Sequence, residues 1–257
     1  MTDNQVNSQD LHKTTICLFD VDGTVTPPRQ MIKSDMEEFM ERLKKKVTVG
    51  LVGGSDLAKI LEQLGGEKAL GKYDYVFSEN GLVAHKNGEC IFKENICRFI
   101  GEERLQKFIN FCLKYLSELW LPFKRGTFIE TRSGLINIAP PGRSCSQVER
   151  DQFEKYDKEH KVRETFIQKL KENFPDYNLV YSIGGQISFD VFPEGWDKRF
   201  CLTQVVADGF EKIYFFGDKT FKGGNDHEIA NDPRTVSFTV TSPENTIQIV
   251  NELLSIQ

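Results

Sequence analysis

Uncharged β-rich runs alternate with helical repeats of apolar residues along the first third of the chain. Residues 15–19 carry no charge, which is typical of a strand buried on both faces of a parallel sheet. Apolar residues at helical spacing follow over 34–46, and a second β-rich run covers 47–52. Residues 57–64 then have a helical pattern, and 75–77 form a third, short strand. Strands separated by helices predict right-handed βαβ units and a parallel sheet.

Short strands paired about turn residues replace this alternation beyond Gly81. The turn signals are Asn87-Gly88, Ser133-Gly134 and Gly184-Gly185. The first of them, an Asn-Gly pair, is a strong hairpin signal. Two long helical patterns lie among these strands, an amphipathic one over 102–119 and a highly charged one over 146–173. This block predicts an antiparallel sheet with helices on one face, an α+β module.

The alternation of strand and helix then returns. The pattern predicts a helix over 197–206, strands over 212–216 and 236–240, and a last helix over 243–254. We therefore predict an α/β protein with a Rossmann-like parallel-sheet core and an inserted α+β cap domain. The core comprises residues 1–85 and 194–257, and the cap comprises 86–193. A module inserted above the carboxyl edge of the sheet is placed to act as a lid.

Composition narrows the class of protein. A hydrophobic content of 39% and a charged content of 28% are ordinary for a soluble globular protein. The net charge of −5 argues against nucleic acid or an anionic membrane as a partner, and no apolar run approaches the ~18 residues that span a bilayer. The polar first residues do not resemble a secretory signal. Six scattered cysteines without a CxxC pair indicate reduced thiols, so we expect a cytoplasmic protein.

Two carboxylates follow the first predicted strand, in ICLFDVDGTVT. Asp20 would lie at the carboxyl end of the strand, where open α/β sheets bind ligands, and Asp22 would project to the same side. Like charges so placed are unfavourable without a partner, and hard carboxylate oxygens suit Mg²⁺. A Ca²⁺ loop can also begin DxDG, but it needs Gly at its sixth position and Glu at its twelfth. Val25 and Met31 occupy those positions and exclude it.

Three further polar motifs fall at predicted strand ends of the same core. They are Gly53-Gly54-Ser55-Asp56, Lys198 after Gly195-Trp196-Asp197, and Gly217-Asp218 with Gly223-Gly224-Asn225-Asp226. Together with DxDGT, these motifs in this order resemble the haloacid dehalogenase superfamily of phosphotransferases. The resemblance implies that Asp20 attacks phosphorus and becomes an aspartyl phosphate. It also implies that Asp22 protonates the leaving oxygen and then deprotonates the next attacker.

The same resemblance assigns the remaining groups that phosphoryl transfer requires. Magnesium would be held by Asp20, the backbone carbonyl of Asp22 and Asp218. Ser55 would donate a hydrogen bond to the phosphoryl group, and Lys198 would supply a fixed positive charge. Asn225 and Asp226 would position metal-bound water and Lys198. Ser55 and Asp226 have a structural alternative, because each could cap the helix that follows it.

Segments of the predicted cap indicate one family within this superfamily. FIETR, PPGRSCSQVER and GGQISFDVFPEGWDKR, with TPPRQ in the core, resemble the eukaryotic phosphomannomutases. The resemblance implies that arginines hold the substrate's non-reacting phosphate, to which the planar guanidinium fork is suited. The implied phosphate or sugar ligands are Arg29, Arg132, Arg143, Arg150, Ser188 and Asp190. Alternatively, Arg150 solvates a charged helix, and Ser188 and Asp190 are satisfied polar residues on a strand.

This second resemblance implies an isomerase that interconverts mannose 6-phosphate and mannose 1-phosphate. It further implies a hexose 1,6-bisphosphate as activator, a role in GDP-mannose synthesis and a homodimer formed through the cap. A second, structural cation site would use the carboxylate of Asp232 and the backbone carbonyls of Ala230 and Thr235.

Two other functions remain open from the sequence. A Mg²⁺-dependent sugar-phosphate phosphatase could use the same scaffold, with water as the attacker in place of a sugar hydroxyl. A non-catalytic phosphosugar-binding protein is the second alternative. The arginine cluster favours a mutase over a phosphatase, which needs no second tight phosphate site. The intact Asp20, Asp22, Lys198 and Asp218 favour an enzyme.

Overall fold

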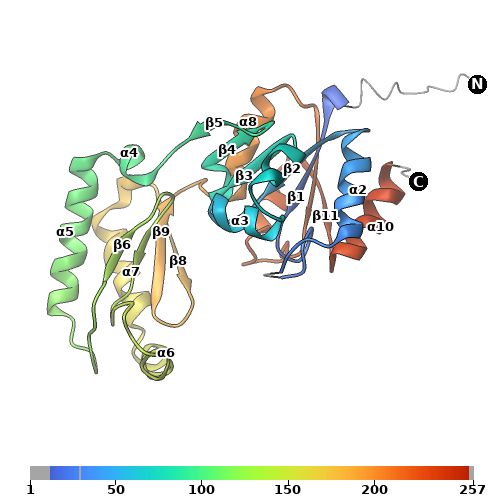
Figure 1. Cartoon of the computed structure of the whole chain (residues 1–257). Helices are drawn as coiled ribbons and strands as arrows, with labels where there is room; N and C mark the ends of the chain where they lie inside the picture. Colours follow the sequence, from blue (N-terminus) through green and yellow to red (C-terminus); the bar gives the residue numbers. More distant parts are fainter. Residues whose placement is uncertain (1–11, 29, 255–257) are drawn as a thin grey trace, which may run out of the picture. The chain divides into compact units, whose positions relative to one another are not determined.

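The chain folds into two compact units (Figure 1). The computed structural model describes residues 12–28 and 30–254. The first unit extends to Lys93 and resumes at Gly195, and the second unit is Glu94–Glu194. An α+β module is therefore inserted into an α/β core, which is the predicted fold class.

A seven-stranded sheet forms the centre of the first unit, in the order β11-β10-β1-β2-β3-β4-β5. Its strands are β1 (Thr15–Asp20), β2 (Thr48–Val52), β3 (Tyr75–Ser78), β4 (Val83–Lys86), β5 (Glu89–Lys93), β10 (Lys212–Gly217) and β11 (Thr235–Thr239). The five strands from β11 to β3 are parallel, whereas β4 and β5 are antiparallel. All six residues of β1 are buried, which confirms the predicted central strand. The segments that follow β1, β2 and β10 meet at the carboxyl edge of the sheet.

Helices cover both faces of this sheet because alternate residues of each strand point to opposite faces. On one face, α2 (Ser34–Lys44), α3 (Leu57–Gln63) and α10 (Pro243–Leu254) pack with Cys17 and Phe19. On the other face, α8 (Cys201–Ala207) and α9 (His227–Ala230) pack with Ile16 and Leu18. Three 3-10 turns complete the unit: η1 (Glu67–Lys72), η2 (Glu79–Gly81) and η4 (Lys198–Phe200). Among the described helices, none is long and apolar enough to cross a bilayer.

The Asn87-Gly88 hairpin forms as predicted but belongs to the core. Asn87 and Gly88 have φ angles of +51° and +87°, the positive values that a tight hairpin turn needs. Through this turn β5 pairs with β4 and extends the core sheet. The inserted unit therefore begins at Glu94 and not at residue 86.

The second unit is an antiparallel sheet in the order β6-β7-β9-β8, with helices packed against it. Its strands are β6 (Ile129–Thr131), β7 (Ile136–Ile138), β8 (Leu179–Gly184) and β9 (Ser188–Pro193). Its helices are α4 (Ile96–Ile100), α5 (Glu102–Glu118), α6 (Gln147–His160), α7 (Val162–Asn173) and the 3-10 turn η3 (Pro175–Tyr177). Phe166 of α7 meets Phe189 of β9 edge to face, with ring centroids 5.4 Å apart. The face that carries Phe189 is therefore apolar, and the alternate residues form a polar face.

The charged helical stretch predicted over 146–173 is two helices. Lys161 has a φ of +53° and separates α6 from α7. The carboxylate of Asp157 accepts hydrogen bonds from the backbone N–H of Arg163 at 2.9 Å and from its Nε at 2.8 Å. Both side chains are buried, so this ion pair fixes the break between the helices. The sequence pattern did not show the break because no Gly or Pro marks it, and the residue with positive φ is a lysine.

Candidate active site

Asp20 ends β1 and is buried, with 4% of its surface exposed. The chain then turns tightly, and the backbone N–H groups of Val25 and Thr26 both donate to the carbonyl of Val21. Gly23 has a φ of +82°, and a Cβ at this position would lie 2.5 Å from the Oδ2 of Asp218. Glycine therefore allows the loop after β1 to approach the segment after β10.

Lys198 joins Asp20 to Asp226. Its Nζ donates to the Oδ1 of Asp20 and, at 2.6 Å, to the Oδ1 of Asp226, and its side chain is fully buried. Burial alone lowers the pKa of Lys198, but the two carboxylates outweigh it and raise that pKa above its ordinary value. The buried ammonium group of Lys198 is therefore held between two carboxylates, at the position where the resemblance implies a fixed positive charge.

Three carboxylates meet at the carboxyl edge of the sheet. Oxygen atoms of Asp20, Asp218 and Asp226 all lie within 4.8 Å of one another. Burial raises the pKa of Asp20 to about 6, although Lys198 opposes the shift, and burial also raises the pKa of Asp218. Among the described residues, the buried Oδ1 of Asp218 has no hydrogen-bond partner. An unsatisfied oxygen beside a second carboxylate fits a hard cation such as Mg²⁺.

Asp226 contributes to this site through Lys198 and the backbone. Its Oδ2 accepts the backbone N–H of Lys219 at 3.1 Å, and it makes no capping hydrogen bond to α9. The alternative reading as a helix cap is therefore wrong. Asp20 and Asp218 remain as the carboxylates best placed for a cation, because Asp226 is already engaged.

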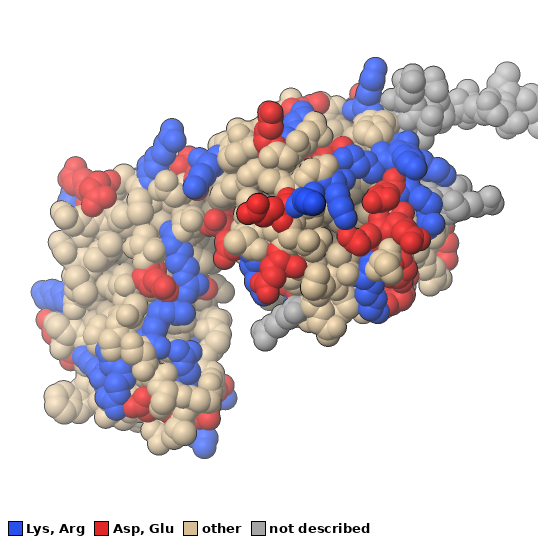
Figure 2. All heavy atoms as spheres, in the orientation of Figure 1, with Lys and Arg blue, Asp and Glu red and all other residues tan. Residues whose placement is uncertain are grey.

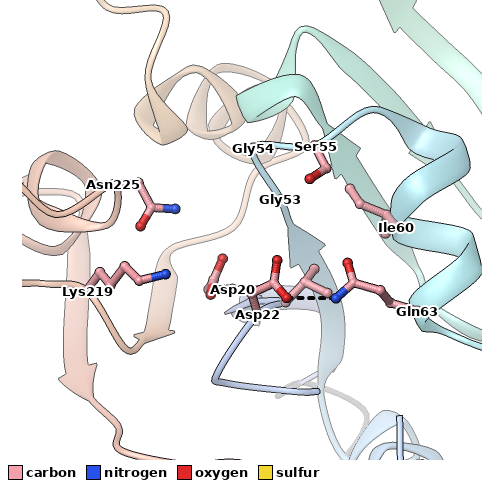
Figure 3. Close-up of a pocket in the computed structure, with 10 residues that line it drawn as sticks. Asp20, Asp22, Gly53, Gly54, Ser55, Ile60, Gln63, Lys219 and Asn225 are labelled. Atoms are coloured by element: carbon pink, nitrogen blue, oxygen red, sulfur yellow. Dashed lines mark hydrogen bonds between the residues drawn. The ribbon is translucent and has the colours of Figure 1, made fainter. Parts of the chain in front are cut away.

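Gln63 holds the second carboxylate of the DxD motif. Its Nε2 donates to the Oδ1 of Asp22 at 2.7 Å (Figure 3). The same nitrogen donates to the hydroxyl of Thr26 at 3.4 Å. Gln63 is 3% exposed, at the end of α3. The sequence analysis missed this residue. Its position three residues after Ile60, on the apolar face of a helix, was the signal that could have identified it.

A pocket lies beside the carboxylates of Asp20 and Asp22. Its lining includes Asp20, Val21, Asp22, Gly53, Gly54, Ser55, Ile60, Gln63, Lys219 and Asn225. Figure 3 shows Lys219 and Asn225 directed toward the space around Asp20. Asp56 caps α3 through a 2.9 Å hydrogen bond from the N–H of Lys59, so Ser55 is not the cap of this helix. The sequence analysis did not include Lys219, which adds a positive charge to the pocket.

Three of the predicted arginines, Arg132, Arg143 and Arg150, lie in the second unit, where a glutamate joins two of them. The Oε2 of Glu130 accepts hydrogen bonds from Nε and Nη2 of Arg132, at 3.1 and 2.7 Å, and forms an ion pair with Nε of Arg143 at 3.0 Å. On the face of this unit that Figure 2 shows, Lys and Arg side chains gather with acidic groups among them.

Asn137 extends this arrangement to the other predicted ligands. Its Oδ1 accepts from Nη1 of Arg143 at 2.6 Å, and its Nδ2 donates to Asp190 at 2.6 Å and to Ser188 at 3.1 Å. We call Glu130, Arg132, Asn137, Arg143, Ser188 and Asp190 the polar row. The structure thus brings four of the predicted ligands together and adds Glu130 and Asn137, which the sequence analysis did not identify.

One predicted ligand, Arg150, contacts the backbone beside this row. Arg150 donates to the backbone carbonyls of Cys145, at 3.2 Å, and Arg143, at 2.7 Å. It therefore braces the loop that carries Arg143. Arg29 lies outside the described residues.

The loop predicted to bind a second cation is held by protein groups. Arg234 donates to both carboxylate oxygens of Asp232, at 2.8 and 2.7 Å, and holds the pKa of that carboxyl below its ordinary value. The carbonyl of Ala230 accepts the hydroxyl of Ser237 at 2.7 Å, and the hydroxyl of Thr235 donates to backbone carbonyls. A guanidinium therefore occupies the place of a counter-ion at Asp232.

The sequence is similar to one characterised family over most of its length. The pattern of the family described as eukaryotic phosphomannomutase matches residues 36–256. Phosphomannomutase 1 of Dictyostelium discoideum is 58% identical over 240 residues, which cover 93% of this chain and 96% of that protein. The phosphomannomutase of Glycine max is 60% identical, over 91% of this chain and 93% of that protein.

Solved structures share the fold at much lower sequence identity. A trehalose-6-phosphate phosphatase of Aspergillus fumigatus has a TM-score of 0.57 and 14% identity, and the match covers 98% of each chain. A match at this identity supports the fold, an α/β core with an inserted unit.

Proposed function

Since this chain belongs to the eukaryotic phosphomannomutase family, we propose that it interconverts mannose 6-phosphate and mannose 1-phosphate. The observation that carries the proposal is the pairing of Arg132 with Arg143 through Glu130. A mutase needs a second anion site, apart from the reacting phosphoryl group, because its bisphosphate intermediate binds in two orientations. Buried Asp20, which forms an ion pair with Lys198, lies at the first site, where the reacting phosphoryl group would bind.

Asp20 is the proposed nucleophile. A carboxylate oxygen forms a bond to phosphorus of a hexose 1,6-bisphosphate, the bond from phosphorus to the sugar oxygen breaks, and Asp22 gives its proton to that oxygen. Gln63 donates to the Oδ1 of Asp22 and so orients this carboxyl group for the proton transfer. Lys198 stabilises the negative charge that develops on the phosphoryl oxygens.

The phosphoryl group then passes to mannose 6-phosphate. Asp22 removes the proton from the C1 hydroxyl as that oxygen attacks the aspartyl phosphate, and mannose 1,6-bisphosphate forms. This intermediate binds again in the reversed orientation and returns its 6-phosphoryl group to Asp20. Mannose 1-phosphate leaves, and the aspartyl phosphate is restored.

Magnesium is the proposed cofactor, held by Asp20, Asp218 and the backbone carbonyl of Asp22. It would neutralise charge on the phosphoryl oxygens. The unpartnered Oδ1 of Asp218 supports this assignment. Asn225 and Asp226 have positioning roles, and the contact from Asp226 to Lys198 supports the second of these. At Asp232, the bound guanidinium of Arg234 gives less support to a second cation.

The polar row is the proposed site for the substrate's non-reacting end. Arg132 and Arg143 would bind the phosphate, and Ser188 and Asp190 would contact sugar hydroxyls. Arg150 supports Arg143 by donating a hydrogen bond to its backbone carbonyl. Arg29 is a further proposed ligand. A phosphatase would not need such a row, so the row favours the mutase over a sugar-phosphate phosphatase on the same fold.

Assembly and location are also proposals. Phe99, Leu113 and Trp120 expose apolar surface on the second unit, and Trp120 is 91% exposed. This surface supports a homodimer formed through that unit. All six cysteines are free thiols, which supports a reducing compartment such as the cytoplasm. The product would serve GDP-mannose synthesis.

Product analysis tests the function. Mannose 1-phosphate is incubated with Mg²⁺ and a catalytic amount of glucose 1,6-bisphosphate, and ³¹P NMR follows the sugar phosphates and free phosphate. Mannose 6-phosphate without comparable free phosphate is the expected result. Asp20→Asn should abolish it, whereas Glu211→Gln, an exposed carboxylate of the same unit, should not. Free phosphate as the main product would favour the phosphatase instead.

A further inference from the structure

We infer that Asn137 is a positioning residue that sets the orientation of Arg143 and Asp190 for the sugar phosphate. The inference rests on the proposed function, because it concerns the same substrate. It adds a residue to which neither the sequence nor the family resemblance gave a role.

Strand register places Asn137 in the middle of the polar row. Asn137 of β7 pairs with Glu130 of β6 on one side and with Asp190 of β9 on the other. Directly paired residues of antiparallel strands point to the same face. The three side chains therefore lie in line across the polar face of the sheet.

Asn137 is more buried than its neighbours Glu130 and Arg143 in the polar row. Only 3% of its surface is exposed, whereas the side chains of Glu130 and Arg143 are 39% and 32% exposed. A buried amide must satisfy its hydrogen-bonding groups within the protein. Its partners therefore cannot be exchanged for water without a loss of stability.

Every side-chain partner of Asn137 is a residue that the resemblance assigns to the substrate. The amide oxygen accepts a hydrogen bond from Arg143, and the amide nitrogen donates to Asp190 and to Ser188. A purely structural asparagine has no reason to select these three side chains. The amide thus connects the phosphate-binding and the sugar-binding parts of the row.

The polarity of these contacts allows one orientation of the amide. In the flipped orientation its N–H groups would face the guanidinium of Arg143, which only donates, and its oxygen would face the carboxylate of Asp190, which only accepts. The network therefore fixes Asn137, and Asn137 in turn fixes its partners.

Arg143 is held at two nitrogens by different residues. Nη1 donates a hydrogen bond to Asn137, Nε forms an ion pair with Glu130 at 3.0 Å, and Nη2 takes part in neither contact. A guanidinium held in this way loses little further freedom when a phosphate binds to Nη2, which lowers the entropic cost of binding.

Three variants test the inference in the full-length protein. Asn137→Ala removes all three contacts. Asn137→Asp keeps an acceptor for Arg143 but places a second carboxylate against Asp190. Asn173→Ala is the matched control, because that amide bonds only to the carbonyl of Lys169 within α7. Calorimetry gives the affinity for mannose 1-phosphate, and steady-state kinetics give KM and kcat.

Asn137→Ala should raise Kd and KM about tenfold or more while kcat changes much less, since the loss affects binding of the non-reacting end. The control should match the wild type. Circular dichroism and thermal melting verify the fold. If Asn137→Ala does not fold, Asn137→Ser keeps a smaller polar group at the position and provides the same comparison.

Asn137→Asp provides a readout that a merely structural role would not change. The charged groups that face the position are Glu130 and Arg132 from β6, Arg143 from the loop after β7, and Asp190 from β9. Two adjacent carboxylates take up a proton more readily than one. Affinity relative to the wild type should therefore be low at pH 8 and recover toward pH 6.

Unchanged Kd and KM in Asn137→Ala would overturn the inference, as would a fall in kcat alone. An Asn137→Asp affinity with the same pH dependence as the wild type would also overturn it. If the wild type itself neither binds nor converts mannose 1-phosphate, the proposed function fails, and this inference fails with it.

Discussion

The side-chain amide of Gln63, which is 3% exposed, donates to the Oδ1 of Asp22 at 2.7 Å. A group with this placement orients the carboxyl group of the proposed acid and base. The contact joins α3 to the loop after β1, so one helix end supports the chemistry.

Gln63→Leu should reduce kcat for sugar-phosphate interconversion by about tenfold to a hundredfold, with little change in KM, because the proton transfer loses its orientation. The substitution keeps an apolar side chain of similar size on the buried face of α3. Rapid-quench measurement of aspartyl phosphate formation locates the lost step. Glu62→Gln, on the exposed face of α3, is the control. A variant that retains the wild-type kcat would contradict this role.

Lys198→Met should destabilise the first unit by about 3–5 kcal/mol, because Asp20 and Asp226 would remain buried without their counter-ion. Urea denaturation without metal measures the loss. Added Mg²⁺ should restore part of the stability by supplying positive charge near Asp20. Equal stability of the variant and the wild type would show that the two carboxylates do not depend on this lysine.

Binding of Mg²⁺ should weaken as the pH falls through about 6, because burial raises the pKa of Asp20 to that value and protons compete with the cation. The raised pKa of Asp20 affects the stability of the metal-free protein in the opposite direction. The raised pKa contributes stability to the metal-free protein below the ordinary value of 3.8, and this contribution is lost as the pH rises through about 6. Calorimetric titration from pH 5 to pH 8 measures affinity and proton release. Affinity independent of pH over this range would exclude Asp20 as the titrating ligand.

Arg163→Met should destabilise the second unit by about 3–5 kcal/mol, because Asp157 would remain as a buried charge without a partner. Arg163 also donates to the carbonyls of Gly185 and Ser188, so the turn before β9 should loosen. Hydrogen exchange over β8, β9 and α7 measures the effect. Lys169→Met, which breaks only an exposed pair on α7, is the control. Unchanged protection in this region would contradict the prediction.

The elements with strong local patterns could be predicted from the sequence. An uncharged run revealed β1, and Asn87-Gly88 revealed the hairpin. The resemblance to eukaryotic phosphomannomutases, and with it the prediction of an isomerase, is confirmed by the match to the family and its relatives. The association of β5 with the core was missed, because pairing between strands depends on tertiary contacts that local patterns do not specify.

Two of the groups that the sequence analysis missed have one property in common. Gln63 and Asn137 are buried amides whose importance comes from the partner across a fold contact, 41 and 53 residues away for Asp22 and Asp190. A single amide in a sequence gives no sign of its partner. Asp20, Lys198 and Asp218, by contrast, stand in motifs at the ends of predicted strands, and the structure brings them together as expected.

The position of the second unit in the chain also determines when the strands of the core are synthesised. The second unit is one continuous segment, whereas the first unit needs both ends of the chain. During synthesis, β1 emerges early, but its neighbour β10 follows only after the whole insertion has been made. The whole second unit has therefore been synthesised while one edge of β1, the central strand of the core, still lacks its partner. Since an unpaired strand edge can pair with another chain, this architecture exposes β1 to that risk until the last quarter of the chain has been made.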